Sequence, residues 1–257
     1  MIVLINQNAY EQIIKNLNYK VNLILKDKVT STNELLKQQA DSLDHFTVMI
    51  ANEQTNGKGR MGRNFYSPNQ SGIYMSILLK QNLNIKDSLL LTVKCAVAVA
   101  NAIETLSDKQ PKIKWVNDIY INDKKVCGIL TEASMSPKNN NLDYAVVGIG
   151  VNITPIKNPP DDIKNIAGSV FDHQKNIKNQ MIAQIINEFI SLLDCDVLDS
   201  YRNYSMLTGK RVEVINPQGN YIATVVGIAD DFSLIVDNQE GERHFLNSGE
   251  VRVKAYE

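Results

Sequence analysis

The residues best suited to bind an anion lie in the segment 57–63, which reads Gly-Lys-Gly-Arg-Met-Gly-Arg. It holds three cations and three glycines and no acidic residue. Glycines let the backbone approach a ligand and expose N–H groups, and lysine and arginine add charge-assisted hydrogen bonds to phosphate or carboxylate. The segment predicts an anion-wrapping loop. A solvated basic loop or a weak nucleic-acid patch is the alternative, because neither a Walker A nor a GxGxxG pattern is present.

Two lysine-containing segments follow. Residues 114–118 read Lys-Trp-Val-Asn-Asp, in which Asp118 could hold Mg²⁺ or orient a lysine and Asn117 could contact an adenine edge. Lys125 begins an otherwise apolar stretch, and Gly128 would leave space for a ring lying against the strand. Taken singly, these segments also fit an Asn-Asp turn and an edge lysine on a hairpin.

Glycine and hydroxyl residues mark two more segments. Residues 148–152 read Gly-Ile-Gly-Val-Asn, so one strand face is bare, either for a flat ligand or for close backbone packing. Residues 31–34 read Ser-Thr-Asn-Glu, which has the spacing of a capping box. Alone, this segment predicts only the start of a helix.

Alternating strand and helix patterns must position these segments. Long apolar stretches at helical spacing predict helices over 88–106 and 181–193, with a further helix through Tyr201 and Tyr204. Residues 53–72 and 154–170 are predicted loops. The predicted strands are 47–51, 73–79, 112–115, 119–121, 126–131 and 144–153, followed by 211–215, 221–228, 233–236 and 243–246. The last four strands are short and separated by turn residues, which predicts a small barrel-like β module and two domains, 1–207 and 208–257.

Composition narrows the function classes. The 257 residues are 44% hydrophobic and carry a net charge of −1, which argues against disorder and against a protein that coats nucleic acid. Three widely spaced cysteines and three histidines form no zinc pattern and fit a reducing cytosol. The apolar residues 1–5 are too few for a signal peptide, and no later stretch approaches the ~20 apolar residues of a membrane span.

Taken together and in this order, the segments resemble biotin–protein ligase, also called biotin–[acetyl-CoA-carboxylase] ligase. The resemblance covers about residues 25–153, and the C-terminal β module also fits. Three positions depart from the family pattern: Lys58 replaces an arginine, Phe65 a tryptophan and Val116 a proline. Only 30 residues precede Ser31, too few for the winged-helix domain of repressor-type members, so we expect the enzyme-only form.

The resemblance implies an α+β fold, with a mixed sheet and packed helices like those of class II aminoacyl-tRNA synthetases, and an SH3-like C-terminal barrel. It also implies two reaction steps. The carboxylate of biotin attacks the α-phosphorus of ATP, with Mg²⁺, to give biotinyl-5′-AMP and pyrophosphate. A lysine of a biotin carboxyl carrier protein, from acetyl-CoA carboxylase or a related biotin enzyme, then attacks this anhydride. We expect the loop 53–68 to be mobile without ligand.

Residue roles follow from the matched positions. The residues expected at biotin are Ser31, Thr32, Asn33, Gln54, Lys58, Gly59, Arg60, Lys125, Gly128 and Leu130. Those expected at ATP are Arg60, Arg63, Phe65, Trp115, Asn117 and Asn152. Lys125 and Arg60 are expected to stabilise charge on the α-phosphate, and Asp118 to assist placement of the metal or of a lysine.

Two rival functions stay open at this point. A lipoate or octanoate transferase-type enzyme shares the activation chemistry, although the basic loop favours biotin. A non-enzymatic binding module, gripping nucleic acid through the loop, is disfavoured by the near-zero net charge. We expect a cytoplasmic protein with no DNA or membrane partner, and a homodimer through the catalytic sheet is left open.

Overall fold

Eight strands form one mixed sheet in the computed structural model, which describes residues 7–80, 83–84, 87–136, 141–173, 176–215, 219–247 and 250–253. β1 and β2 pair in parallel and the other neighbours are antiparallel. In spatial order the strands are β1 (Asn22–Val29), β2 (Thr47–Gln54), β3 (Gly72–Leu79), β8 (Asn141–Asn152), β7 (Lys124–Met135), β6 (Asp118–Ile121) and β5 (Lys112–Lys114), and β4 (Leu83–Asn84) pairs with β8.

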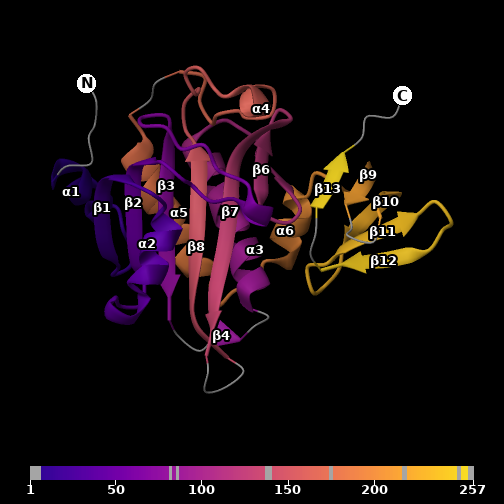
Figure 1. Ribbon diagram of the computed structural model, residues 1–257, viewed down its shortest axis with the longest axis horizontal. Helices are drawn as coiled ribbons and strands as arrows, with labels where there is room; N and C mark the ends of the chain where they lie inside the picture. Colours follow the sequence, from indigo (N-terminus) through magenta and orange to yellow (C-terminus); the bar gives the residue numbers. More distant parts are fainter. Residues whose placement is uncertain are drawn as a thin grey trace.

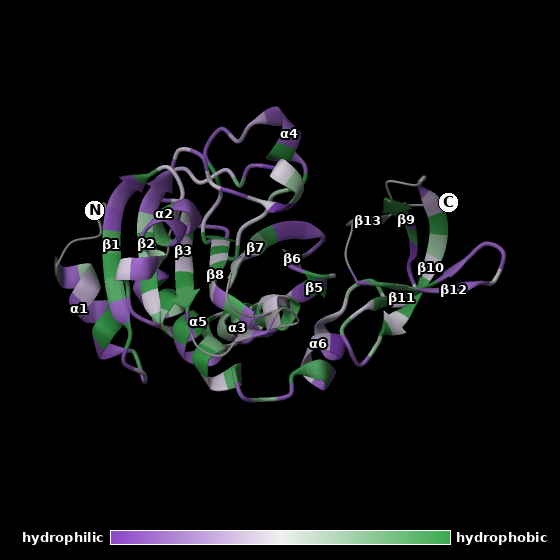
Figure 2. Ribbon diagram, turned by 60° about the horizontal axis from the view of Figure 1, so that its bottom comes forward, coloured by the Kyte–Doolittle hydropathy of each residue, from purple (hydrophilic) through white to green (hydrophobic). Residues whose placement is uncertain are grey.

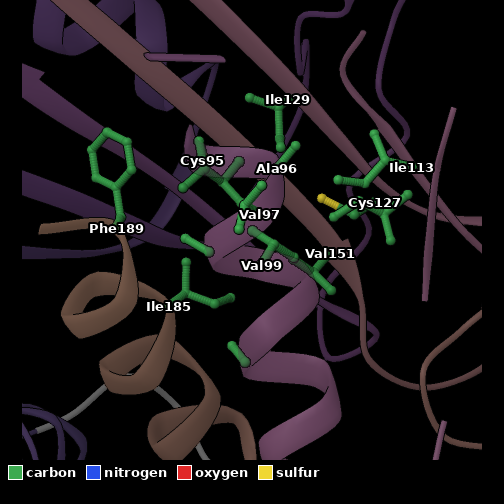
Figure 3. Close-up of a cluster of buried hydrophobic side chains, with 14 of the residues drawn as sticks. Cys95, Ala96, Val97, Val99, Ile113, Cys127, Ile129, Val151, Ile185 and Phe189 are labelled. Atoms are coloured by element: carbon green, nitrogen blue, oxygen red, sulfur yellow. The ribbon is translucent and has the colours of Figure 1, made fainter. Parts of the chain in front are cut away.

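Helices cover both faces of this sheet (Figure 1). One face packs on α3 (Asp87–Leu106), which in turn packs on α5 (Lys178–Leu192), and α1 (Gln7–Lys15) lies against α5. The other face carries α2 (Thr32–Gln38), beneath which Leu36, Met49 and Leu78 form a separate small core. Figure 3 shows the larger core, in which Cys95 and Val99 of α3 meet Ile129 of β7 and Phe189 of α5.

Helix α3 meets the length and hydropathy expected of a membrane span over 88–106, contrary to the sequence expectation. Its mean hydropathy there is 1.6, but 67% of the stretch is buried inside the protein. The apolar composition therefore reflects contact with the sheet and with α5, since a helix that is apolar all round is a core helix when it is enclosed.

A second, antiparallel sheet of five strands follows α6 (Leu198–Tyr204) and lies at the right of Figure 1. Its order is β12 (Arg243–Leu246), β11 (Leu234–Asn238), β10 (Tyr221–Ile228), β9 (Arg211–Ile215) and β13 (Glu250–Val253). The indole Nε1 of Trp115 donates to the carbonyl oxygen of Phe232 at 2.9 Å, and the Tyr201 hydroxyl donates to that of Val116 at 3.0 Å. The first contact joins the C-terminal sheet to the segment between β5 and β6, and the second joins α6 to the same segment.

Most predicted elements are confirmed, with shifted ends. The predicted strands 126–131 and 144–153 are longer or displaced as β7 and β8. The predicted loops contain the short helices η2 (Arg60–Gly62) and α4 (Asp161–Lys164), and η1 (Ala40–Ser42) follows α2. Besides these three short helices, α1, β1, β4 and β13 were not predicted. Figure 2 shows why β1 is difficult to recognise, because its first half is hydrophobic and its second half hydrophilic, as expected of a partly exposed edge strand.

Candidate active site

The central strands form the floor of the site, because successive side chains of a strand point to opposite faces of the sheet. Odd-numbered residues of β3, β7 and β8, such as Met75, Ile129 and Ile149, belong to the core shared with α3. Even-numbered side chains therefore point to the opposite face, beside α2. On that face lie the predicted site residues Gly128, Leu130 and Asn152.

A cavity of about 1610 Å³ opens over this floor. All sixteen residues that the sequence analysis predicted for the site line it, which brings together segments up to 121 positions apart in the chain. They are Ser31, Thr32, Asn33, Gln54, Lys58, Gly59, Arg60, Arg63, Phe65, Trp115, Asn117, Asp118, Lys125, Gly128, Leu130 and Asn152. Their shared location is a structural result, whereas their individual roles stay predictions.

The basic loop is folded back on itself at one side of the cavity. The backbone N–H of Phe65 donates to the carbonyl of Gly57 at 2.8 Å, and that of Gly59 donates to the carbonyl of Arg63 at the same distance. Met61 and Gly62 both have positive φ, 55° and 73°. This tight turn holds Arg60 so that its Nη1 donates to Oδ1 of Asn117 at 2.9 Å. The predicted mobility of the loop stays a prediction.

The alternate glycines make room for protein side chains. A Cβ at Gly150 would lie 2.5 Å from Cε1 of Phe65, and one at Gly128 would lie 3.2 Å from Cε2 of the same ring. Gly128 and Gly150 are register partners on β7 and β8, so together they form a bare platform under Phe65. A Cβ at Gly148 would lie 2.2 Å from Oδ1 of Asn33. The groups that lie against Gly148 and Gly150 are side chains, the Asn33 amide and the Phe65 ring, and not the backbone of another segment. The interpretation as a surface for a flat ligand stays a prediction.

Lys125 provides an ammonium group beside this platform, since a Cβ at Gly128 would also lie 3.3 Å from its Nζ. Its Nζ lies 2.7 Å from Oδ1 of Asp118, and both side chains are less than one third exposed. The backbone of Lys125 is fixed on both sides, since its N–H donates to the carbonyl of Ile166 and its carbonyl accepts from Gly168 N–H, each at 2.8 Å. The pair combines a cation with a carboxylate inside the cavity. Of the two roles expected for Asp118, this contact is the one with a lysine, and the role with a metal stays a prediction.

Asn117 and Asn152 differ in their hydrogen bonding. The Nδ2 of Asn117 donates to the carbonyl of Ile129 at 2.8 Å while its Oδ1 accepts from Arg60, so this amide positions Arg60. The predicted contact of Asn117 with adenine stays a prediction. Asn152 donates to the carbonyl of Gly168 at 3.0 Å, and its buried Oδ1 has no hydrogen-bond partner among the residues that the structure describes. This oxygen is a ready acceptor for a ligand N–H, because an unpaired buried polar atom is costly.

Sequence reasoning missed several residues at the cavity. Lys210 and Arg211, at the start of the C-terminal sheet, add positive charge to its lining, and Asp162 and Ile163 of α4 form part of its rim. No local signal indicates these, because Lys210 and Arg211 reach the cavity through the position of the C-terminal sheet, and Asp162 and Ile163 through that of the segment after β8. Glu132, behind the lining, was also missed, although it has the same strand parity as Gly128 and Leu130.

Comparison with known proteins agrees with this geometry. Residues 25–152 match the model of the Biotin/lipoate A/B protein ligase family. Bifunctional ligase/repressor BirA of Bacillus spizizenii is 30% identical over 230 residues, covering 85% of this chain and 70% of that protein. The chain belongs to the biotin/lipoate A/B protein ligase family. Another relative in the family, the biotin–[acetyl-CoA-carboxylase] ligase of Mycobacterium tuberculosis, is 25% identical over 86% of this chain and 85% of its own.

Solved structures of the family share the fold. The biotin protein ligase from Aquifex aeolicus in complex with biotin and ATP superposes with a TM-score of 0.75 at 26% identity. That match covers 91% of this chain and 99% of the other. The mixed sheet with packed helices described above is thus the catalytic fold of biotin protein ligases.

Proposed function

We propose that this chain is a biotin–protein ligase, which uses ATP to activate biotin as biotinyl-5′-AMP and transfers biotin to a lysine of a carrier protein. The observation that carries the proposal is the assembly of the whole motif set around one cavity in a chain of this family. The cavity holds a basic loop, a lysine–carboxylate pair and a polar recess, which suit two anions and a polar ring.

The first step must bring two anions together, the biotin carboxylate and the α-phosphate. We assign two cations to offset this repulsion and to stabilise the charge that grows on the phosphate oxygens. They are Arg60, held by Asn117, and Lys125, held by Asp118. Arg63 belongs to the same basic loop and would face the triphosphate, whereas the backbone of Lys58 would help to hold the ureido ring of biotin. The carboxylate oxygen forms the bond to phosphorus while pyrophosphate leaves, so no protein nucleophile is required.

We assign recognition of the two substrates to opposite ends of the cavity. Ser31, Thr32, Asn33 and Gln54 would hold the ureido ring of biotin, with Leu130 along its tail. Phe65 would cover the adenine, and Asn152 would accept from its amino group. The support is geometric, since Thr32 and Asn33 are buried polar residues at one end and Oδ1 of Asn152 is an unpaired buried acceptor at the other.

Magnesium fits this site as a companion of the nucleotide. Within the described part of the chain, no group of three histidine, cysteine, aspartate or glutamate side chains could hold a metal ion. Mg²⁺ commonly binds one or two carboxylates together with substrate phosphates, and Asp118 is the carboxylate beside Lys125. When bound, the ion would neutralise phosphate charge, and Asp118 would hold it or position Lys125.

The remaining assignments are also proposals. We assign residues 1–207 to the catalytic domain, like that of class II aminoacyl-tRNA synthetases, and 208–257 to an SH3-like module, supported by its five antiparallel strands. The acceptor would be a biotin carboxyl carrier protein, with no DNA or membrane partner. A homodimer is compatible with the sheet edge at β1. Three free cysteines support a cytoplasmic location.

Incubation with ATP, Mg²⁺ and labelled biotin tests the function directly. Mass spectrometry should detect biotinyl-5′-AMP and, after addition of a carrier domain, biotin on its lysine. A parallel reaction with lipoate should give far less product. Failure to form the biotin conjugate under these conditions, or preference for lipoate, would overturn the proposal.

A further inference from the structure

A chain of hydrogen bonds runs from the surface to the biotin end of the cavity. The carboxylate of Glu132 accepts from Nζ of Lys37 at 2.6 Å and from Nδ2 of Asn33 at 2.8 Å. Oδ1 of Asn33 accepts from the Ser76 hydroxyl at 2.5 Å. Ser76 Oγ then lies 2.6 Å from Oγ1 of Thr32, which lines the cavity.

The direction of each bond in this chain is determined by its partners. A carboxylate and a backbone carbonyl only accept, so the contacts of Asn33 with Glu132 and with the carbonyl of Leu130 require its Nδ2 on that side. Its Oδ1 therefore faces Ser76 and accepts a hydrogen bond from the hydroxyl group of that residue, which has only one proton to donate. All three hydroxyl and amide side chains between Glu132 and the cavity are at most 4% exposed, so their protein neighbours are the partners that determine these directions.

Thr32 must then donate its own proton to Ser76. Two hydroxyl oxygens 2.6 Å apart repel each other unless a proton lies between them, and the proton of Ser76 is already committed. The other acceptor near Thr32 Oγ1, Oε1 of Gln54, is more distant at 3.1 Å and already accepts from the Thr32 backbone N–H at 2.8 Å. Oγ1 of Thr32 can therefore accept a hydrogen bond from a ligand in the cavity but has no proton to donate to it.

We propose that Glu132 is a positioning residue for ligand specificity, which fixes this relay so that Thr32 accepts a hydrogen bond from the ligand. The inference rests on the proposed binding of biotin and extends it, because a cyclic urea offers N–H donors where a lipoate ring offers none. Lys37 holds the Glu132 carboxylate in place. Its Nζ also donates to Glu34 at 2.8 Å, outside the hydrogen bonds that lead from Glu132 to Thr32.

The charge of Lys37 is well maintained. Burial acts to lower the pKa of Lys37, but the hydrogen bonds that Lys37 donates to Glu132 and Glu34 outweigh it and raise the pKa above its usual value. The charged Lys37 would therefore donate a hydrogen bond to the carbonyl oxygen of an amide side chain at position 132. The NH₂ of that amide would then face Nδ2 of Asn33, and either two donors oppose each other or Asn33 turns over and reverses the relay.

Isothermal titration with Glu132→Gln, Lys37→Met and the double variant tests this reasoning. Glu132→Gln should weaken biotin binding by about tenfold, the value of one well-placed hydrogen bond. It should have little effect on the cyclic carbonate analogue of biotin, in which oxygen replaces both ureido N–H groups. In the double variant the amide is free to present its oxygen to Asn33, so biotin binding should return to within about twofold of Lys37→Met alone.

Controls separate this role from a structural one. Glu34→Gln removes the other partner of Lys37 without touching Asn33, and should bind biotin like the wild type. Thermal denaturation should show all variants folded. Equal weakening of biotin and its carbonate analogue in Glu132→Gln, or no recovery in the double variant, would overturn the inference. If wild-type protein does not bind biotin, the proposed function fails and this inference fails with it.

Discussion

Replacement of Lys125 by alanine should abolish adenylate formation and leave the fold intact. The ion pair with Asp118 is partly exposed, at 29% and 22% of the two side chains, and such pairs contribute about 0–1 kcal/mol to stability. The same ammonium at a developing phosphate charge is worth more. A unit charge about 4 Å away contributes ~4 kcal/mol at the effective dielectric of a partly exposed site. Loss of a comparable transition-state donor costs ~2.7–4 kcal/mol, or about 10²–10³ in rate.

The assay is biotin-dependent pyrophosphate release, measured beside thermal denaturation. Lys112→Ala is the matched control, because Lys112 is an exposed lysine of the same sheet, on the edge strand β5, and does not line the cavity. It should release pyrophosphate at the wild-type rate. Near-normal release by Lys125→Ala would refute the assignment, and so would an equal loss in both variants.

A double-mutant cycle with Asp118→Asn distinguishes the two roles open for this carboxylate. If Asp118 only positions Lys125, its replacement should have no further effect once Lys125 is alanine. If it also holds Mg²⁺ with the nucleotide, the rate should fall again and the magnesium concentration for half-maximal rate should rise in both backgrounds. An unchanged magnesium dependence would exclude the metal role.

Three other predictions follow from packing and burial. Gly148→Ala would place a Cβ 2.2 Å from the buried amide of Asn33, so calorimetry should show weaker biotin binding and a stability loss of about 1–3 kcal/mol; wild-type values would contradict the packing argument. A thiol reagent should label Cys195 in the native protein and all three cysteines after unfolding, because Cys95 and Cys127 are buried and burial raises the pKa of their thiols. Rapid labelling of more than one native thiol would be inconsistent with this. Burial lowers the pKa of Lys178, at the start of α5, to about 8. Between about pH 8 and 10.5 the unfolded chain therefore binds more protons than the folded one, and the free energy of unfolding should rise with pH. Lys178→Met should remove this rise in denaturant titrations, and an unchanged pH dependence of stability would disprove it.

The resemblance to the family predicted which residues meet at the cavity. In the structure, strand order and the period of two carry Gly128, Asn152 and Leu130 to one face. The resemblance did not predict how the residues are connected. Asn117 bonds to Arg60 across 57 positions of sequence, and Asn33 bonds to Glu132 across 99. Such contacts depend on the approach of separate elements, for which a single sequence holds no local signal.

The alternate glycines illustrate the same limit. A bare strand face predicts that something lies close to the backbone, but an aromatic side chain and a flat ligand leave the same pattern. Phe65 occupies the platform made by Gly128 and Gly150. The edge strand β1 was missed for a related reason, since its polar second half removes the alternation on which strand recognition depends.

Trp115 is the single tryptophan of the chain, and its indole bridges to the carbonyl of Phe232. Only 5% of the residue is accessible to water. Any rotation of the C-terminal sheet away from β5 and β6 would hydrate this indole and shift its emission to longer wavelength. The fluorescence of Trp115 therefore reports, in the native protein and without an added dye, on the contact between the C-terminal sheet and the segment that holds Asn117 and Asp118.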